Sequence, residues 1–492
     1  MNFALMLTMG HAPCEQADLE KDGVKSITVA EQSLPTWASA ADLARRIATR
    51  ACTASAAVEE HLARIAALEP HLKAFITVDA DGARRRAREL DVSPQRQGPL
   101  HGLPVAIKDL TRTRGLRTTF GSRAFAGEVP EADDPVVARL RRAGAVIIGK
   151  TNTPEFGFGA VCVNDLQGPT ANPYDLVLTS GGSSGGSAVA VATGMSALAH
   201  GTDFGGSVRT PASFCGVVSI RPAIGVIADP DRELGWTGLA THGAMGRSVA
   251  DAALLLQAMA APNAYDPLST ALAAGPDAPP RRVAVTPDFA VAPVCKAVRR
   301  RFARAVDEMR AVVGEVVEAT PDCAGAPLAF RTLRAAQIAR TYGAFVDGNV
   351  PVSPTVRWNV EAARSLTAQD YLAAEAARTA LWRRFTRFFE QYDVLVTPAA
   401  SVLPWPNAEG ERMEMDGRSL ADILDYLTIT FIVSLVGFPV VTLPAPRQPG
   451  EVPFGLQLIG RPGAEAALIA LAARLEGEAG FCWSPPPSVS ML

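Results

Sequence analysis

Hydrophobic residues recur along this chain in two patterns, one typical of amphipathic helices and the other of buried strands. The helical pattern begins with Leu43 and Ile47, which are four residues apart. A second helix is expected from Thr53 onward, and the run 74–78 is typical of a strand. Residues 1–34 show no periodicity, so we expect them to form a poorly ordered N-terminal lead-in.

The rest of the chain alternates short apolar runs with helical segments. The apolar runs predict strands at 104–108, 145–148, 282–286, 394–397, 440–443 and 454–459. The helical segments are 133–143, 187–199, the stretch that follows the Ser248–Asp251 capping box, and most of 294–392. This alternation predicts an α/β fold in which helices cover a mixed sheet.

The composition excludes several classes of protein. The 492 residues include 47 Lys and Arg against 50 Asp and Glu, so no excess of positive charge is available for binding nucleic acid. With 48% hydrophobic residues, the chain can bury a large core. The seven cysteines are scattered and form no Cys-x-x-Cys pair, which is typical of reduced, buried thiols in the cytosol.

The sequence contains no convincing targeting or membrane segment. The N-terminus has an apolar run but no basic residues before it, so we do not expect a signal peptide. The most apolar later stretch, 427–444, is interrupted by Ser434, Gly437 and Pro439 and is typical of a buried core segment. We therefore expect a cytoplasmic protein that binds neither a membrane nor nucleic acid.

One segment matches the phosphate-binding P-loop pattern letter for letter, but its residue types argue against that structure. Residues 144–151 read Gly-Ala-Val-Ile-Ile-Gly-Lys-Thr. A phosphate cradle needs an open loop with inward-facing backbone N–H groups, followed by a helix. Here the four middle residues are apolar, and Asn-Thr-Pro follows the motif. We predict a buried strand at this point rather than a nucleotide site.

The Gly/Ser-rich segment 180–187 contains a second misleading match, to the Gly-x-Ser-x-Gly nucleophile elbow around Ser184. That mechanism requires an acidic residue and then a histidine downstream of the serine. The last histidine of the chain is His242, so the final 250 residues (492 − 242) contain none. Only His200 and His242 follow the serine, and both lie close to it in sequence. A triad histidine late in the chain is therefore excluded.

A more informative combination is a glycine pair before a serine, together with a lysine at the end of an apolar run. Gly205 and Gly206 precede Ser207, an arrangement that lets consecutive backbone N–H groups face an oxyanion. Lys108 ends the run 104–108, where desolvation would lower its pKa and make it a base near neutral pH. The alternative for this lysine is an ordinary surface position with an exposed amine.

With these residues in place, the chain resembles the amidase signature family. The matching segments, in chain order, are 98–109, 149–157, 172–175, 181–187, 201–209, 214–216, 392–398, 435–439 and 455–462. The resemblance implies one amidase signature domain at 35–485, with core motifs at 98–225 and a variable substrate-pocket segment at about 300–420. It also implies a single large α/β domain whose central mixed β-sheet is covered on both sides by helices.

The resemblance further implies amide hydrolysis through a serine acyl-enzyme. By matching position, Ser207 would be the nucleophile, Ser183 the bridging serine after a cis bond from Gly182, and Lys108 the base. The family's oxyanion hole would consist of the backbone N–H groups of Phe204, Gly205 and Gly206, together with that of Ser207. The residues expected to brace this centre are Ser184, Asp203 and Arg209. No cofactor and no metal are implied; the partner is a small-molecule amide, and the oligomeric state stays open, a homodimer included.

Two alternatives remain at this point. The family also contains the glutaminase (A) subunit of a tRNA-dependent amidotransferase, which usually places an aspartate about a dozen residues before the late Gly-x-Pro to hold the amino group of glutamine. Leu427 stands there in this chain (439 − 12), and its surroundings are largely apolar. A non-catalytic binding member of the fold is the second alternative. Phe204 departs from the family, which commonly has Thr or Ile at that position, so its bulk is expected to shape the acyl pocket.

Overall fold

The computed structural model describes residues 38–274, 280 and 282–487, so the expected lead-in at 1–34 lies outside the described residues. The chain begins with α1 (Ala40–Ala48) and α2 (Ala54–Leu72), followed by β1 (Phe75–Val78). The side chains of Ser39 and Thr53 accept hydrogen bonds from the first turns of these two helices, as N-caps do. The helices and the strand predicted for this region are confirmed.

A mixed sheet of eleven strands forms the centre of the molecule, in the order β1-β3-β2-β6-β8-β7-β14-β15-β11-β9-β10. Its remaining strands are β2 (Pro104–Lys108), β3 (Val146–Thr151), β6 (Leu198–Asp203), β7 (Val218–Arg221), β8 (Thr241–Gly246), β9 (Val283–Val285), β10 (Val316–Glu318), β11 (Val394–Pro398), β14 (Val440–Pro444) and β15 (Gly455–Ile459). Two small antiparallel pairs lie outside it: β4 (Ala171–Asn172) with β5 (Asp175–Thr179), and β12 (Glu414–Met415) with β13 (Arg418–Ser419).

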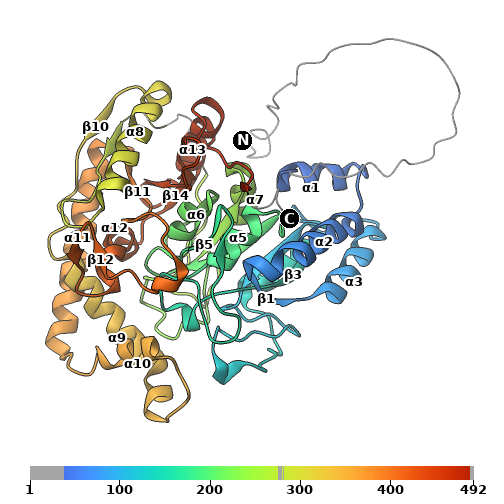
Figure 1. The fold of residues 1–492 in the computed structure, drawn as a ribbon, viewed down its shortest axis with the longest axis horizontal. Helices are drawn as coiled ribbons and strands as arrows, with labels where there is room; N and C mark the ends of the chain where they lie inside the picture. Colours follow the sequence, from blue (N-terminus) through green and yellow to red (C-terminus); the bar gives the residue numbers. More distant parts are fainter. Residues whose placement is uncertain (1–37, 275–279, 281, 488–492) are drawn as a thin grey trace, which may run out of the picture.

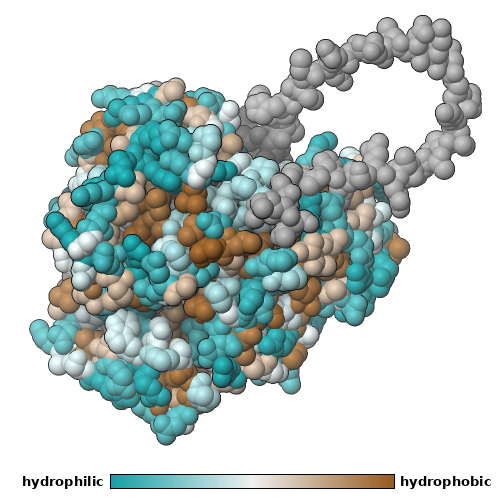
Figure 2. Space-filling model, viewed as in Figure 1, coloured by the Kyte–Doolittle hydropathy of each residue, from teal (hydrophilic) through white to brown (hydrophobic). Residues whose placement is uncertain are grey.

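Helices flank this sheet, in agreement with the predicted fold class. They are α3 (Ala80–Asp91), α4 (Pro135–Arg142), α5 (Gly185–Ala192), α6 (Arg209–Cys215), α7 (Val249–Met259), α8 (Lys296–Val313), α9 (Ala326–Asp347), α10 (Pro354–Glu361), α11 (Ala368–Gln391), α12 (Ile423–Val436) and α13 (Glu465–Glu478). In Figure 1, the N-terminal helices (blue) and helices α8–α11 (yellow to orange) lie at opposite ends of the molecule. Figure 2 shows hydrophilic residues over most of one face, with hydrophobic residues gathered near its middle.

Successive side chains of the central strands enter different hydrophobic clusters on the two faces of the sheet. On β2, Val105 and Ile107 belong to one cluster, and Ala106 belongs to the other. This alternation is the period of two that a strand imposes, and it buries both faces of the sheet. The segment that resembles a P-loop contributes β3, so the predicted strand is confirmed there.

The prediction of one helix over 187–199 is wrong in its second half. Helix α5 ends at Ala192, and Leu198 and Ala199 instead pair with β2 as the start of β6. Gly194 ends the helical segment in the left-handed conformation (φ 68°), which a glycine adopts without steric cost. Among the described residues, no helix combines the length and the apolar composition needed to cross a membrane.

Candidate active site

The parallel pairing of β2 with β6 brings two of the three predicted triad segments together. Both strands end at the same edge of the sheet, so Lys108, the last residue of β2, lies next to the end of β6. Strand β6 continues into a turn that contains Ser207, and α6 follows. Ser183 lies two residues before the start of α5. The buried residues of α5 belong to one of the two hydrophobic clusters that cover the faces of the sheet.

The Lys108 amine is fully buried and faces hydroxyl groups. Its Nζ lies 2.7 Å from Ser183 Oγ, 3.0 Å from Thr202 Oγ1 and, more distantly, 3.5 Å from the Thr202 carbonyl oxygen. Burial lowers the pKa of Lys108 to about 7, because an ammonium group is costly to desolvate. At neutral pH a large fraction of this amine is therefore unprotonated, and it can accept a proton from Ser183.

Backbone and side-chain contacts of Ser184 hold the two serine segments side by side. The Ser184 N–H donates to the Ser207 carbonyl oxygen at 3.1 Å, and the Ser184 hydroxyl donates to the Thr202 carbonyl oxygen at 3.2 Å. The Gly182–Ser183 peptide bond is cis, as the resemblance implies. Ser183 and Ser207 line one cavity, although no direct hydrogen bond joins their hydroxyl groups among the described residues.

The turn before Ser207 presents backbone N–H groups to the same cavity. Among the described residues, the N–H groups of Phe204, Gly205 and Ser207 have no acceptor, whereas the Gly206 N–H donates to Asp203 Oδ1 at 3.0 Å. Gly206 has φ 123°, and a Cβ there would lie 2.5 Å from Thr430 Oγ1. The turn therefore requires glycine at this position.

A network of buried charged residues holds the turn before Ser207 in place. Arg209 forms a bidentate pair with Asp203 at 2.8 and 3.0 Å, and Arg221 lies 3.2 Å from the same carboxylate. Burial alone would raise the pKa of Asp203, but the charges and hydrogen bonds of the two arginines hold it well below its usual range. The carboxylate also accepts from the N–H groups of Gly206 and Val208, so it braces the turn as a permanent anion.

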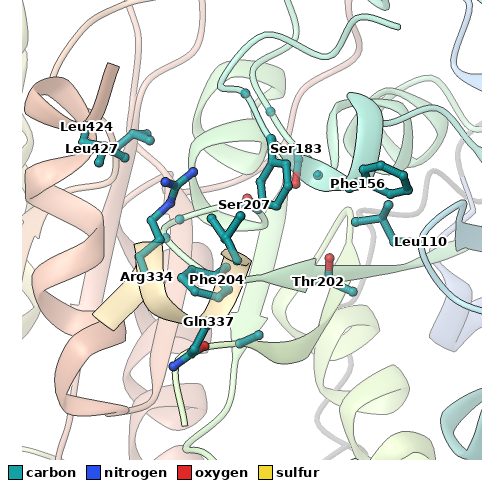
Figure 3. Close-up of a pocket in the computed structure, with 18 of the residues that line it drawn as sticks. Leu110, Phe156, Ser183, Thr202, Phe204, Ser207, Arg334, Gln337, Leu424 and Leu427 are labelled. Atoms are coloured by element: carbon teal, nitrogen blue, oxygen red, sulfur yellow. The ribbon is translucent and has the colours of Figure 1, made fainter. Parts of the chain in front are cut away.

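The cavity above the two serines has a volume of about 260 Å³ and a mostly apolar wall. In the view of Figure 3, Ser183 and Ser207 lie between Phe156 on one side and Arg334 on the other. The lining also includes Phe330 and Gln337 from α9 and, as an apolar edge, Leu424 and Leu427 from α12. Its volume is near the lower end of the range for small-molecule sites.

Several residues of this site had no signal in the sequence. Thr202 belongs to the matched segment 201–209, but nothing singled out its contact with Lys108. Thr430, whose hydroxyl donates to the Gly205 carbonyl oxygen at 2.6 Å, and Arg334 come from helices whose positions depend on the tertiary fold. Within the described ranges, no group of three or more His, Cys, Asp or Glu side chains is placed to hold a metal ion.

The chain is similar to characterised proteins over most of its length. The Amidase family model matches residues 56–469. An acylamidase of Rhodococcus erythropolis is 33% identical, over 91% of this chain and 96% of its own. A relative from Synechococcus sp., the A-subunit of its glutamyl-tRNA(Gln) amidotransferase, is 33% identical, over 90% of this chain and 92% of its own. A crystal structure of an amidase superimposes with a TM-score of 0.80 at 31% identity, covering 90% of this chain and all of that one.

Proposed function

This chain belongs to the amidase family, and from that premise we propose that it is a hydrolase of carboxylic amides that works through an acyl-enzyme on Ser207. The observation that carries the proposal is the buried pair of Lys108 Nζ and Ser183 Oγ, 2.7 Å apart, at the wall of a cavity that Ser207 also lines. A neutral amine beside a hydroxyl that can pass on a proton is what a serine nucleophile requires for activation.

In the proposed reaction, Lys108 accepts the hydroxyl proton of Ser183 while Ser183 accepts that of Ser207. The Ser207 oxygen attacks the amide carbonyl, and the C–N bond then breaks as the proton returns through Ser183 to the leaving nitrogen. Water hydrolyses the resulting ester, giving the carboxylic acid and free Ser207. Attack requires the Ser207 hydroxyl to rotate towards Ser183, which its place at the cavity surface allows.

The unengaged N–H groups of Phe204, Gly205 and Ser207 are the proposed donors to the oxyanion that forms on attack. Gly206 is a less favourable donor than the family pattern implies, because its N–H already donates to Asp203. The donors stand on a turn that Asp203 braces, so they need no rearrangement when charge develops.

We also propose that 35–485 acts as one domain and that its segment at about 300–420 determines which amide is accepted. In support, α9 lies within that segment and contributes Phe330, Arg334 and Gln337 to the cavity wall.

A second candidate function is glutamine hydrolysis as part of an amidotransferase, since relatives with that name are also 33% identical. The cavity argues against it. Among the described residues that line the cavity there is no Asp or Glu, and Leu427 occupies the expected place of the acidic residue. The ammonium group of glutamine would be buried without a partner there, at considerable cost. Glutaminase activity that depends on an added partner protein would reverse this ranking.

The decisive experiment replaces the proposed nucleophile. Ser207→Ala is expected to lower kcat/KM for every accepted member of an amide panel by about 10⁴- to 10⁶-fold, and to abolish labelling by a fluorophosphonate. Ser187→Ala is the matched control, because Ser187 is a buried serine of the same motif that contacts Thr151 and the His200 carbonyl instead of the cavity. Substantial activity or labelling in Ser207→Ala would refute the proposal.

A further inference from the structure

The one charged side chain among the described residues that line the cavity is Arg334. It lies on α9, and Gln337 and Thr341 follow it at helical spacings of three and seven. These spacings put all three side chains on the same face of the helix, and all three line the cavity. Besides the serines and Thr202, the lining therefore contains a polar stripe on α9 with a cation at its end.

Arg334 is 9% exposed, and it lacks the partners that a buried arginine normally has. Its single hydrogen bond to a described residue goes from Nη1 to the side-chain oxygen of Asn359, and its guanidinium carbon lies 5.7 Å from the centre of the Phe158 ring. No carboxylate of the described residues forms an ion pair with it. The other N–H groups of the guanidinium have no acceptor in this part of the chain.

The one carboxylate whose charge acts on Arg334 is Asp422, and it already forms an ion pair with another arginine. Arg331, one helical turn before Arg334, binds both Asp422 and Asp425, the latter at 2.7 Å. Burial lowers the pKa of Arg334 to about 10, so the guanidinium stays charged at neutral pH. Arg331, Arg334 and the two aspartates together carry no net charge. Both carboxylates bind Arg331, however, and neither lines the cavity.

Arg209 shows how this fold treats a buried arginine with a structural role. Its N–H groups donate to both oxygens of Asp203, to Thr430 and Ser434, and to Gln457. An arginine side chain has five N–H donors, and those of Arg209 are all used within the protein. Arg334 is also buried, at 9% exposure against 0% for Arg209, yet only one hydrogen bond engages it, and its side chain lines the cavity that contains Ser207.

We propose that Arg334 binds a carboxylate of the substrate, so that the enzyme acts on amides carrying a second, anionic end rather than on neutral amides. This inference rests on the proposed function, since it concerns the substrate of the same site. A planar carboxylate can accept two parallel N–H bonds from one guanidinium edge, and the apolar wall strengthens that pair by excluding water. The cavity of about 260 Å³ limits the substrate to a short spacer between the amide and the carboxylate.

The test compares amides that carry a terminal carboxylate with matched amides that carry a methyl group in its place. On the acyl side, succinamate, glutaramate and adipamate are compared with butanamide, pentanamide and hexanamide; on the amine side, N-acetyl-β-alanine is compared with N-propylacetamide. In at least one series, the wild-type kcat/KM for the anionic member is expected to exceed that of its neutral match by about 30-fold or more. Equal or lower values for the anionic members in both series would overturn the inference.

Variants of Arg334 separate substrate binding from a structural role. Arg334→Met is expected to remove the preference, lowering kcat/KM for anionic substrates by about 30-fold or more while neutral amides change little. Arg334→Lys should restore part of it, since the charge remains and the bidentate geometry is lost. The control is Arg340→Met, on the same helix, whose side chain is 65% exposed and pairs with Glu233. An equal loss for anionic and neutral amides in Arg334→Met would overturn the inference.

The outcomes also distinguish this inference from the proposed function. If neutral amides are hydrolysed and Ser207→Ala is inactive, the proposed function stands whatever Arg334→Met does. If no amide of either series is hydrolysed, the proposed function fails for these substrates, and calorimetric titration with glutarate decides the inference instead. Binding of glutarate that Arg334→Met abolishes supports the carboxylate site, and absence of binding to the wild type refutes it. As a further check, kcat/KM for glutaramate should exceed that for glutamine, because the ammonium group that glutamine adds has no acidic partner among the described residues that line the cavity.

Discussion

Lys108 on β2 and Lys150 on β3 are two fully buried lysines on neighbouring strands, but their amines have different hydrogen-bond partners. Lys108 is in register with Thr151, and Lys150 is in register with Ile107. Because successive residues of a strand point to opposite faces, the two amines lie on different sides of the sheet. Burial lowers the pKa of both, to about 7 for Lys108 and about 8 for Lys150. Burial alone therefore does not separate a base from a structural cation.

The difference lies in what the neighbouring hydroxyl groups can do. Lys150 donates to the Thr111 carbonyl and to the hydroxyl groups of Thr113 and Thr118. Those two hydroxyls already donate their protons to backbone carbonyls, at 3.2 and 3.0 Å, so they can only accept from the amine. Three acceptors require the three protons of an ammonium group.

The two nearest partners of Lys108 are instead hydroxyl groups whose protons are not committed, and its one carbonyl acceptor, that of Thr202, is more distant at 3.5 Å. Among the described residues, neither Ser183 Oγ nor Thr202 Oγ1 donates to another acceptor. The Ser183 hydroxyl can therefore rotate and donate its proton to a neutral amine, as a general base requires. The hydroxyl groups beside Lys150 cannot do so. The direction of the surrounding hydrogen bonds, rather than depth in the core, distinguishes the two lysines.

The strongest test of this contrast is Lys108→Met, which removes the amine but keeps much of the side-chain volume. We expect kcat/KM for an accepted amide to fall by about 10²- to 10⁴-fold, the usual contribution of a general base. Unfolding restores the pKa of this amine from about 7 to 10.5, so the wild-type fold loses stability as the pH falls from 10.5 to about 7. Methionine removes that cost, and the unfolding free energy at pH 7 in urea should be unchanged or higher. A variant that keeps activity within tenfold of wild type would contradict the assignment.

The matching substitution on the other strand, Lys150→Met, should change stability instead. It removes a buried ammonium that donates three hydrogen bonds, together with the positive charge that partly offsets the rise that burial causes in the pKa of Asp109. Losing the hydrogen bonds of a buried ammonium is expected to cost about 1–3 kcal/mol of unfolding free energy, measured by urea denaturation. Activity per folded molecule should stay within several-fold of wild type, because the hydrogen bonds of Lys150 go to threonines outside the cavity and to neither serine of the candidate site. If Lys150→Met were as stable as wild type and as inactive as Lys108→Met, the comparison would be reversed.

The contrast was only partly predictable from the sequence. The apolar runs around Lys108 and the residues before Lys150 indicate buried strands, and both strands form as predicted. The resemblance implies that Lys108, Ser183 and Ser207 come together, and in the fold Lys108 contacts Ser183, which lines the same cavity as Ser207. The orientation of a hydroxyl proton depends on third partners, such as the Leu116 carbonyl that engages Thr118, and no local pattern encodes those partners.

The sequence was least informative where the elements carry glycine and histidine rather than branched apolar residues. Strands β6 and β8 lie at the centre of the sheet, yet their segments read Leu-Ala-His-Gly-Thr-Asp and Thr-His-Gly-Ala-Met-Gly and show no strand periodicity. Packing against adjacent segments of the fold determines their conformation. At Gly243, for example, the Cβ of any other residue would lie 3.0 Å from the Ile220 carbonyl oxygen and from the side chain of Val208. The resemblance placed the substrate pocket at about 300–420, which includes α9, but it did not single out the α9 residues that line the cavity, because that helix is partly buried on several sides.

The smallest expected effect is on the pH dependence of activity. It concerns the Thr202 hydroxyl beside Lys108 and tests directly whether the hydrogen bonds around this lysine distinguish it from Lys150. The wild-type rate kcat/KM should fall about tenfold per pH unit below an acidic limb at about 7, as Lys108 becomes protonated and can no longer accept from Ser183. Thr202 Oγ1, at 3.0 Å, accepts from the charged amine and so favours the protonated form.

Thr202→Val keeps the shape of the side chain and removes that acceptor. We expect the acidic limb of the kcat/KM profile to move to lower pH by less than about one unit, because the ammonium loses one hydrogen bond of about 0.5–1.5 kcal/mol. The maximal rate should change by only a few-fold, since Ser183 keeps its contact with Lys108 at 2.7 Å. The control is Thr113→Val beside Lys150, which should leave the limb in place. A limb that stayed fixed in Thr202→Val, or moved to higher pH, would mean that another group than Lys108 controls the acidic side of the profile.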